Sequence, residues 1–375
     1  MSPSPLSNVD LGVFFEERHH ALASSLEPIE LEDDLECARA MGKSGLFEHL
    51  VPDAGADVRT LVLIREHLGY YSAMADSIFA VQGLGSYPIL LAGNDDQRAL
   101  LPKFRAGEYI GAFGLTEPEA GSDVASMQTT AVRDGDSFVL NGAKTLISNA
   151  GIATHYTVFA NADPDKGRKG ISAFIVEAGT PGFEVEPMEV IATHPIGALR
   201  FENCRVPATA LLGELGGGFR LAMQTLDTFR VTVGAAAVGM ARRAFDDALE
   251  RVSTRTQFGK PLAEQQLVQG HLADMSTELD AARMLVLRAA YEKDQGKARV
   301  TLEAAKAKLF ATEAAQRIID RAVQLFGGLG VVRGTAVEEL YRAIRPLRIY
   351  EGTSEIQRLI IGRGVVKQLA EEKRG

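Results

Sequence analysis

Residues 110–212 carry a series of short β-forming runs with no helical pattern between them, and this feature constrains the fold most. Examples are residues 157–159 and 172–176, which loops such as 161–170 separate from their neighbours. Parallel strands need long crossover connections, usually helices, so this texture indicates an antiparallel barrel or sandwich.

Helical periodicity lies on both sides of this block. In residues 13–105, apolar side chains such as Leu61, Ile64 and Leu68 recur at helical spacing. After the glycines at 216–218, two long amphipathic stretches follow, joined by a short Asp-Gln-Gly turn at 294–296, which suits a helical bundle. The sequence therefore predicts a multidomain α+β protein, with an N-terminal helical domain (1–110), a middle β domain (111–213) and a C-terminal helical domain (214–375).

The composition argues against several classes of function. Forty Lys and Arg against forty-nine Asp and Glu give a net charge of −9 over 375 residues, which offers no basis for nucleic-acid binding. Residues 231–240 are apolar but far shorter than the ~20 residues of a membrane-spanning helix. Residues 1–10 lack the pattern of a targeting signal, and Cys37 and Cys204 cannot form a zinc cage or a disulfide framework. We expect a cytoplasmic protein with no membrane association and no metal site.

Residues 115–123 and the region around Glu351 are the first two candidate sites. Thr116 and Ser122 add hydroxyl donors to a loop with free N–H groups, which suits a carbonyl-rich ring or a phosphate but also describes a plain polar turn. Gly352 breaks the helical pattern and places Glu351 on a turn beside apolar residues, as a general base requires. The alternative is that Glu351 caps the chain or pairs with Arg345 or Arg348.

Two further segments allow both a binding and a structural interpretation. Arg255, near Gly259 and Pro261, could clamp a pyrophosphate or could simply meet a helix C-terminus. The glycines in residues 324–330 allow close approach to the backbone, yet their spacing is not the dinucleotide fingerprint and alone indicates a helix end. The histidines show no ligand spacing, and no Gly-x-Ser-x-Gly motif supports a serine hydrolase.

Taken together, the order and separation of these segments resemble the acyl-CoA dehydrogenase family over nearly the whole chain. The matching stretches are residues 115–123, 141–149, 201–207, 255–262, 324–330 and 350–357. The most similar branch carries its catalytic glutamate in the C-terminal Tyr-Glu-Gly-Thr motif. The resemblance implies a helical N-terminal domain, a middle antiparallel β-barrel and a C-terminal four-helix bundle. It also implies FAD as cofactor, an acyl-CoA substrate, an electron-transfer flavoprotein as acceptor, and a homotetramer arranged as a dimer of dimers with shared sites.

The resemblance also assigns roles to individual residues. Glu351 matches the catalytic base, whereas Phe229, at the position that carries the base in another branch, cannot take a proton. The substrate-binding residues it implies are Ser122, Asp227, Phe229, Arg230 and Gly352. The cofactor-binding residues it implies are Phe113, Leu115, Thr116, Gly121, Ser122, Leu146, Ile147, Ser148, Arg255, Gln257, Phe258, Gln265, Gln266, Gln324, Leu325, Gly327, Gly328, Thr353 and Glu355.

The expected activity is FAD-dependent α,β-dehydrogenation of an acyl thioester in lipid metabolism. Three features depart from the family: Leu146 where a tryptophan is common, residues 191–197 in place of the usual Gly/Arg/Ser pattern, and a short N-terminal region. The alternatives are a carrier-protein-linked dehydrogenase or flavin oxidase of secondary metabolism, and a catalytically silent scaffold of the same fold.

Overall fold

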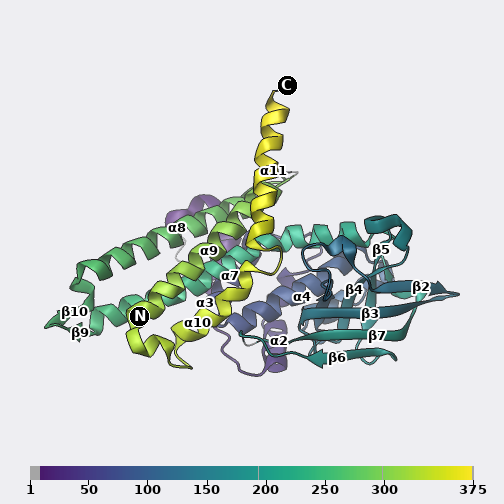
Figure 1. The fold of residues 1–375 in the computed structure, drawn as a ribbon, viewed down its shortest axis with the longest axis horizontal. Helices are drawn as coiled ribbons and strands as arrows, with labels where there is room; N and C mark the ends of the chain where they lie inside the picture. The colour runs from purple at the N-terminus through teal and green to yellow at the C-terminus, as the bar shows by residue number, and fades with distance from the viewer. Residues whose placement is uncertain (1–8, 193, 298, 374–375) are drawn as a thin grey trace. The chain divides into compact units, whose positions relative to one another are not determined.

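The computed structural model of the chain describes residues 9–192, 194–297 and 299–373 (Figure 1). Its contacts define two compact units. The helical unit comprises Met1–Pro28, Asp57–Ala73 and Arg230–Gly375, and the sheet unit comprises Ile29–Ala56 and Met74–Phe229. Most of the segment searched for a targeting signal lies outside the described residues, as does Thr193.

The helical unit is built around two long helices, α8 (Gln266–Asp294) and α9 (Thr301–Phe326). They are antiparallel, because Arg317 pairs with Glu278 while Arg321, farther along α9, pairs with Asp274, farther back along α8. The predicted turn at 294–296 is confirmed, and Gly296 adopts a φ of 77° there. The other elements of the unit are η1 (Val9–Phe14), α1 (Glu17–Ser25), α3 (Val58–Tyr71), the part of α7 (Gly218–Thr254) from Arg230, β9 (Thr256–Gln257), β10 (Lys260–Pro261), η6 (Leu262–Glu264), η7 (Gly327–Val331), α10 (Ala336–Ile344), η8 (Arg345–Arg348) and α11 (Ser354–Glu372).

Small residues let the helices of this unit approach closely. A Cβ on Gly69 of α3 would lie 2.5 Å from the Ala236 carbonyl oxygen of α7, and one on Gly239 would lie 2.1 Å from the Glu66 oxygen. The buried face of α9 is equally rich in alanine, with Ala311 at its centre. Close packing of this kind is sensitive to any added methyl group, so the helices hold a fixed register.

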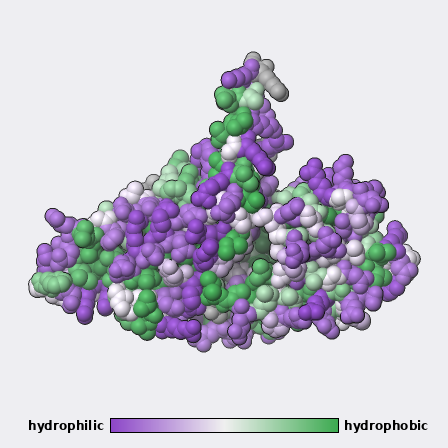
Figure 2. Space-filling view, viewed as in Figure 1, coloured by the Kyte–Doolittle hydropathy of each residue, from purple (hydrophilic) through white to green (hydrophobic). Residues whose placement is uncertain are grey.

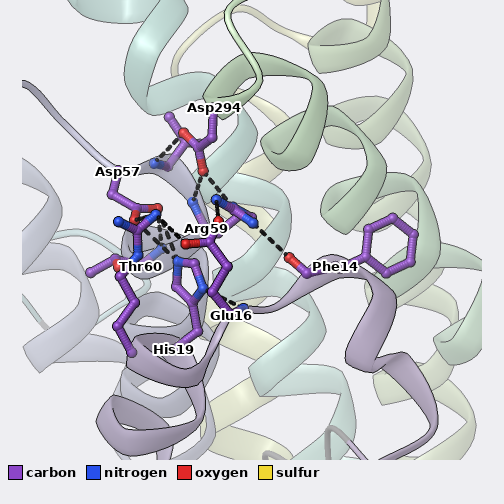
Figure 3. A network of polar contacts seen from close by, with 9 residues as sticks. Phe14, Glu16, His19, Asp57, Arg59, Thr60 and Asp294 are labelled. Carbon is purple, nitrogen blue, oxygen red and sulfur yellow. Dashed lines mark hydrogen bonds and ion pairs between the residues drawn. The ribbon is translucent and has the colours of Figure 1, made fainter.

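A polar network joins α1, α3 and the end of α8 inside the helical unit (Figure 3). The Arg59 guanidinium donates to the Asp294 carboxylate at 2.9 Å, to Glu16 at 2.7 Å and to the Phe14 carbonyl oxygen at 3.0 Å. Asp57 caps α3 and contacts the buried His19 ring at 3.1 Å. The buried guanidinium is thereby compensated by two carboxylates, as a buried charge requires.

The sheet unit contains an eight-stranded mixed sheet in the order β6-β7-β3-β2-β4-β5-β8, with β1 paired to β4. The strands are β1 (Gly111–Gly114), β2 (Thr130–Asp134), β3 (Ser137–Ser148), β4 (His155–Asn161), β5 (Ile171–Glu177), β6 (Phe183–Pro187), β7 (Ile196–Pro207) and β8 (Leu211–Leu212). The helices are α2 (Asp34–Lys43), η2 (Leu46–His49), α4 (Ala73–Ala92, from Met74), α5 (Asp95–Arg98), α6 (Leu101–Arg105), η3 (Val124–Ser126), η4 (Pro164–Lys169), η5 (Ala208–Ala210) and the start of α7.

The sequence prediction of a sheet between two helical regions is confirmed, but the prediction that it is purely antiparallel is wrong. Both β1 and β2 run parallel to β4. The reason is that the β2–β3 hairpin itself forms the long crossover between β1 and β4, so no helix is needed there. Among the described residues no pairing joins β6 to β8, so the strands form an open sheet and no closed barrel is seen.

The helices predicted as one N-terminal domain are divided between the two units. α1 and α3 pack in the helical unit, whereas α2, α4, α5 and α6 belong to the sheet unit. α4 is fixed to β1 by Gln82, whose amide donates to the Phe104 and Tyr109 carbonyl oxygens and accepts from the Gly111 N–H at 2.7 Å. β1, and the loop that follows it, are thereby anchored. No helix of the described residues is both long and apolar enough to cross a membrane.

Candidate cofactor and catalytic sites

The loop after β1 is the first candidate site, and it lies in the sheet unit. It is held to β3 by a hydrogen bond from the Thr145 N–H to the Thr116 carbonyl oxygen at 2.9 Å. Phe113 and Thr116 are half-buried, and Leu115 is buried. Gly121 and Ser122 are exposed, and a Cβ on Gly121 would have no heavy atom within 4 Å. The loop therefore presents polar groups to open space from a rigid support.

A buried ion pair supports this loop from beneath. Lys144 of β3 is fully buried and donates to the Glu117 carboxylate at 2.7 Å, which also accepts from the Gln128 and Thr129 N–H groups. Burial lowers the pKa of Lys144 to about 8, although Glu117 opposes this shift. Burial alone would raise the pKa of the Glu117 carboxyl, but Lys144 and these hydrogen bonds outweigh it and hold that pKa below its ordinary value.

The end of β3 carries a strained bulge beside the loop. The register with β7 shifts between Lys144 and Ile147, and Leu146 adopts a φ of 56° with half of its surface exposed. Ile147 is buried, and the Ser148 hydroxyl lies 3.2 Å from Nε2 of His194. Residues with a strained backbone conformation cluster at functional sites. Packing does not explain the conformation of Leu146, because half of its side chain is exposed. The bulge thus adds an apolar face to the donor-rich loop.

Glu351, in the helical unit, lies on the predicted turn between η8 and α11. Glu351 has a φ of 50° and Gly352 a φ of 93°, so two consecutive residues are left-handed. Thr353 is the N-cap of α11 and accepts from the Ile356 N–H at 3.3 Å, while Glu355 is exposed in the first turn of that helix. The turn that Gly352 predicts is confirmed.

The carbonyl oxygens of this turn are hydrogen-bonded by two buried side chains. Lys308 of α9 donates to the Gly352 oxygen at 2.8 Å, and the Gln357 amide donates to the same oxygen at 2.9 Å and to the Glu351 oxygen at 3.3 Å. Arg348, one of the partners considered for Glu351, lies 2.9 Å from the Glu313 carboxylate. The orientation of the Glu351 backbone is therefore fixed by hydrogen bonds from side chains of α9 and α11.

A third group of predicted residues lies at the far end of the α8–α9 pair, also in the helical unit. Phe258 and Gly259 form the two-residue tip of the β9–β10 hairpin, with φ values of 50° and 80°, and Phe258 is 95% exposed. Gly327 adopts a φ of 65° and a ψ of −141°, which only glycine tolerates. The members of this group are Arg255, Gln257, Phe258, Gln265, Gln266, Gln324, Leu325, Gly327 and Gly328.

The predicted substrate helix is α7. Phe229 is fully buried in the sheet unit, where its ring meets the Tyr87 ring edge-on at 5.5 Å and would clash with any Cβ on Gly83. Asp227 is half-buried, and Arg230 is 7% exposed at the start of the helical unit's part of the helix. Phe229 thus has a clear packing role in the structure.

Sequence reasoning missed the residues that support these sites. Glu117 and Lys144 lie within the matching stretches, but no motif assigns them a role, and none points to Lys308 or to the contact of His194 with Ser148. Lys308 had a usable signal, since it falls on the apolar face of α9 between Ala304 and Ala311. Among the described residues no three His, Cys, Asp or Glu side chains form a group that could hold a metal.

Comparison with known proteins decides the family. The family profiles for the acyl-CoA dehydrogenase N-terminal, middle and C-terminal domains match residues 12–108, 112–204 and 216–366. The chain belongs to the acyl-CoA dehydrogenase family. The family catalyses FAD-dependent dehydrogenation of acyl-CoA thioesters, so the predicted activity and enzyme class are confirmed, and the scaffold and carrier-linked alternatives are not favoured.

Two curated relatives and one solved structure illustrate the match. An acyl-CoA dehydrogenase of Bacillus subtilis is 41% identical over 353 residues, covering 91% of this chain and 93% of that protein. A short-chain-specific acyl-CoA dehydrogenase of Megasphaera elsdenii is 42% identical over 321 residues, covering 84% of each. The structure of butyryl-CoA dehydrogenase from the same organism has a TM-score of 0.84 and 37% identity, covering 97% of this chain and 96% of that one.

Proposed function

We propose that this acyl-CoA dehydrogenase oxidises a CoA thioester to its trans-2-enoyl product, with Glu351 as the base that removes the α-proton. The observation that carries this assignment is the turn itself. Its two left-handed residues hold a carboxylate outside any helix, on a backbone braced by Lys308 and Gln357. A base must be held in place to act on a weak carbon acid, because proton transfer depends on geometry before pKa.

The residues of the sheet unit fit FAD as the cofactor. Thr116, Ser122 and the loop N–H groups can donate to the carbonyl-rich ring and to the pyrophosphate, and the exposed Leu146 offers an apolar surface to a flat ring. When bound, FAD supplies an oxidised ring whose N5 accepts the β-hydride. Ser148, with Ile147 packed beneath the bulge, is the residue we assign next to that nitrogen.

The residues to which we assign binding of the thioester are Ser122, Asp227, Arg230 and Gly352. Phe229, which the sequence also suggested, is fully buried against Tyr87 and would support α7 rather than contact the substrate. The main-chain N–H group of Glu351 is suited to stabilise the negative charge that develops on the thioester oxygen. The residues of this chain would thus bind the thioester, take its α-proton and stabilise the resulting oxyanion.

We propose that each FAD site is completed by a second copy of the chain. Lys308, beside the Glu351 turn, and Gln324 lie on the same helix and are separated by about 24 Å along its axis at 1.5 Å per residue. This separation suggests that Gln324 and its neighbours, including Arg255, serve a different flavin from the one Glu351 serves. Thr353 and Glu355 complete the proposed set of cofactor contacts.

The surface of α11 supports self-association. Leu359, Val365, Val366 and Leu369 are each about half exposed or more, and Figure 2 shows hydrophobic residues along this helix. Exposed apolar residues on one helix are typical of a surface that another chain covers. We therefore propose a dimer of dimers. From the resemblance to the family we also propose a C-terminal four-helix bundle, the domain division at residues 110 and 213, a cytoplasmic location and an electron-transfer flavoprotein as acceptor.

The test is anaerobic bleaching of the flavin by a panel of acyl-CoA thioesters of varied chain length and branching. The purified protein should contain about one FAD per chain. Glu351→Gln should retain FAD and bind substrate, yet slow flavin reduction by roughly 10²–10⁴-fold, the usual contribution of a general base. Glu339→Gln, an exposed carboxylate on α10, is the matched control and should bleach normally. Near-normal bleaching by Glu351→Gln would refute the assignment of the base.

A further inference from the structure

Lys308 is a buried lysine whose ammonium group bonds to a main-chain carbonyl group. It is fully buried in α9, and its Nζ donates to the Gly352 oxygen at 2.8 Å. The same oxygen accepts from the Gln357 amide at 2.9 Å. Two donors therefore hold one carbonyl group in a turn where Gly352 adopts a positive φ readily but Glu351 has little intrinsic preference for it.

The charged groups that act on Lys308 lie on the turn and on three helices. They are Glu351 on the turn, Arg230 on α7, Glu313 on α9 itself and Glu355 on α11. Glu313 is hydrogen-bonded by the Ser354 hydroxyl and paired with Arg348, and the side chain of Glu355 is 78% exposed. Of the three carboxylates, Glu351 is therefore the one whose charge Lys308 is best placed to influence.

An ammonium group at this position is unfavourable for stability alone. Burial lowers the pKa of Lys308 to about 8, although Glu351 counteracts it, while Arg230 adds to the lowering. A neutral side chain of similar shape would avoid the desolvation of a charge altogether. The charge on Lys308 therefore lowers the stability of the folded protein, and packing alone gives no reason for a lysine at this position.

We propose that Lys308 is a positioning residue for Glu351. Its hydrogen bond to the Gly352 oxygen fixes the direction of the turn, and its positive charge favours the ionised form of the neighbouring carboxylate. This inference rests on the proposed function for the identity of the base. The inference adds one residue of α9, Lys308, that keeps Glu351 oriented and ionised so that it can accept a proton.

The experiment compares Lys308→Met with Lys308→Arg, using Lys306→Met as the matched control two residues earlier on α9. Flavin reduction by the best acyl-CoA is followed anaerobically from pH 5.5 to 8.5. In Lys308→Met the acid limb of the profile should move up by about one pH unit, and the limiting rate should fall more than the substrate affinity. Lys308→Arg, which keeps the charge, should retain the wild-type acid limb.

A second variant separates the charge from the hydrogen bond. Gln357→Met removes the other donor to the Gly352 oxygen without changing any charge, so it should lower the rate and leave the acid limb in place. Equal melting temperature and FAD content in all variants would show that the folds are comparable. A Lys308→Met profile that overlays that of Lys306→Met, or a Gln357→Met profile shifted as much as that of Lys308→Met, would overturn the proposal.

Hydrogen–deuterium exchange of the holoprotein without substrate keeps this test independent of the proposed reaction. Amides of residues 351–353 should exchange at least several-fold faster in Lys308→Met than in Lys306→Met or in the wild type. If no thioester bleaches the wild-type flavin, the proposed function fails, while faster exchange still supports the contact. Unchanged exchange in Lys308→Met would refute the role of Lys308 in holding the turn.

Discussion

The buried pair of Glu117 and Lys144 offers the sharpest test of how the loop at residues 115–123 is supported. In Glu117→Gln the new side chain has nearly the same shape, but its single amide oxygen can replace only one of the two carboxylate oxygens that accept from the N–H groups of Gln128 and Thr129. Also lost is the negative charge 2.7 Å from the Lys144 ammonium group, which is fully buried. The substitution therefore removes one charge and one hydrogen-bond acceptor next to the loop, and of these two losses the charge is the one that makes stability depend on pH.

The magnitude follows from the pKa of Lys144. With Glu117 present, burial lowers that pKa to about 8, from an ordinary value of 10.5. Without the carboxylate it should fall further, so that the folded variant keeps Lys144 neutral near neutral pH. Each pH unit below 8 then destabilises the variant by about 1.4 kcal/mol relative to the wild type, or by about 3 kcal/mol at pH 6. This value lies near the range for breaking a buried pair.

The sign of the pH dependence is opposite to that of ordinary salt-bridge loss. Below pH 8, Lys144 is protonated in both the folded and the unfolded wild type, so it adds no slope to stability there. In Glu117→Gln the unfolded chain binds a proton at Lys144 that the folded protein lacks, so stability rises with pH from 6 to 8. The difference in stability between the two proteins should therefore be smallest near pH 8, where the effect of the lost acceptor remains, and largest in acid.

Urea unfolding of the purified holoprotein at pH 6, 7 and 8 would measure this difference. The double variant Glu117→Gln with Lys144→Met should recover most of the lost stability at pH 6 and show no slope from this pair, because no buried charge remains. Parallel curves for Glu117→Gln and the wild type across this range would refute the reasoning. So would a double variant as unstable as the single one at pH 6.

Two further predictions concern the helical unit. Arg255→Ala should weaken FAD retention and loosen subunit association together, measured by flavin content and analytical ultracentrifugation; tightly bound FAD in a monomer would contradict the shared site. Arg59→Met should lower the free energy of unfolding by about 3–5 kcal/mol, because it leaves the buried Asp294 carboxylate without its cation. Arg18 is exposed and pairs with Asp57, so the control Arg18→Met should change that free energy by less than about 1 kcal/mol.

Patterns that are local in sequence predicted local structure well. The step of three and four residues predicted α8 and α9, and it places Met275, Leu279 and Val286 on the buried face as observed. Gly352 predicted the turn at Glu351, because a break in periodicity and a permissive backbone coincide there. The helix–sheet–helix order also followed from the change between helical periodicity and short β-forming runs along the chain.

Relations between distant segments could not be predicted in this way. The parallel pairs of β1 and β2 with β4 depend on the path of a hairpin, which period-2 patterning does not encode. The division of the N-terminal helices between two units likewise depends on which partner buries each apolar face. Hydrophobic periodicity predicts which face of a helix is buried, but it does not identify the element that covers this face.

The sequence by itself determined the family, the order of helices and strands, and the carboxylate turn, because each is encoded in motifs or in spacing along one segment. Only the tertiary structure revealed that Lys144 pairs with Glu117 in the loop at residues 115–123 and that Lys308 donates to the Gly352 oxygen beside Glu351. The physical reason is that a buried charge is tolerated only where another segment compensates it, and that partner is brought close by folding rather than by sequence.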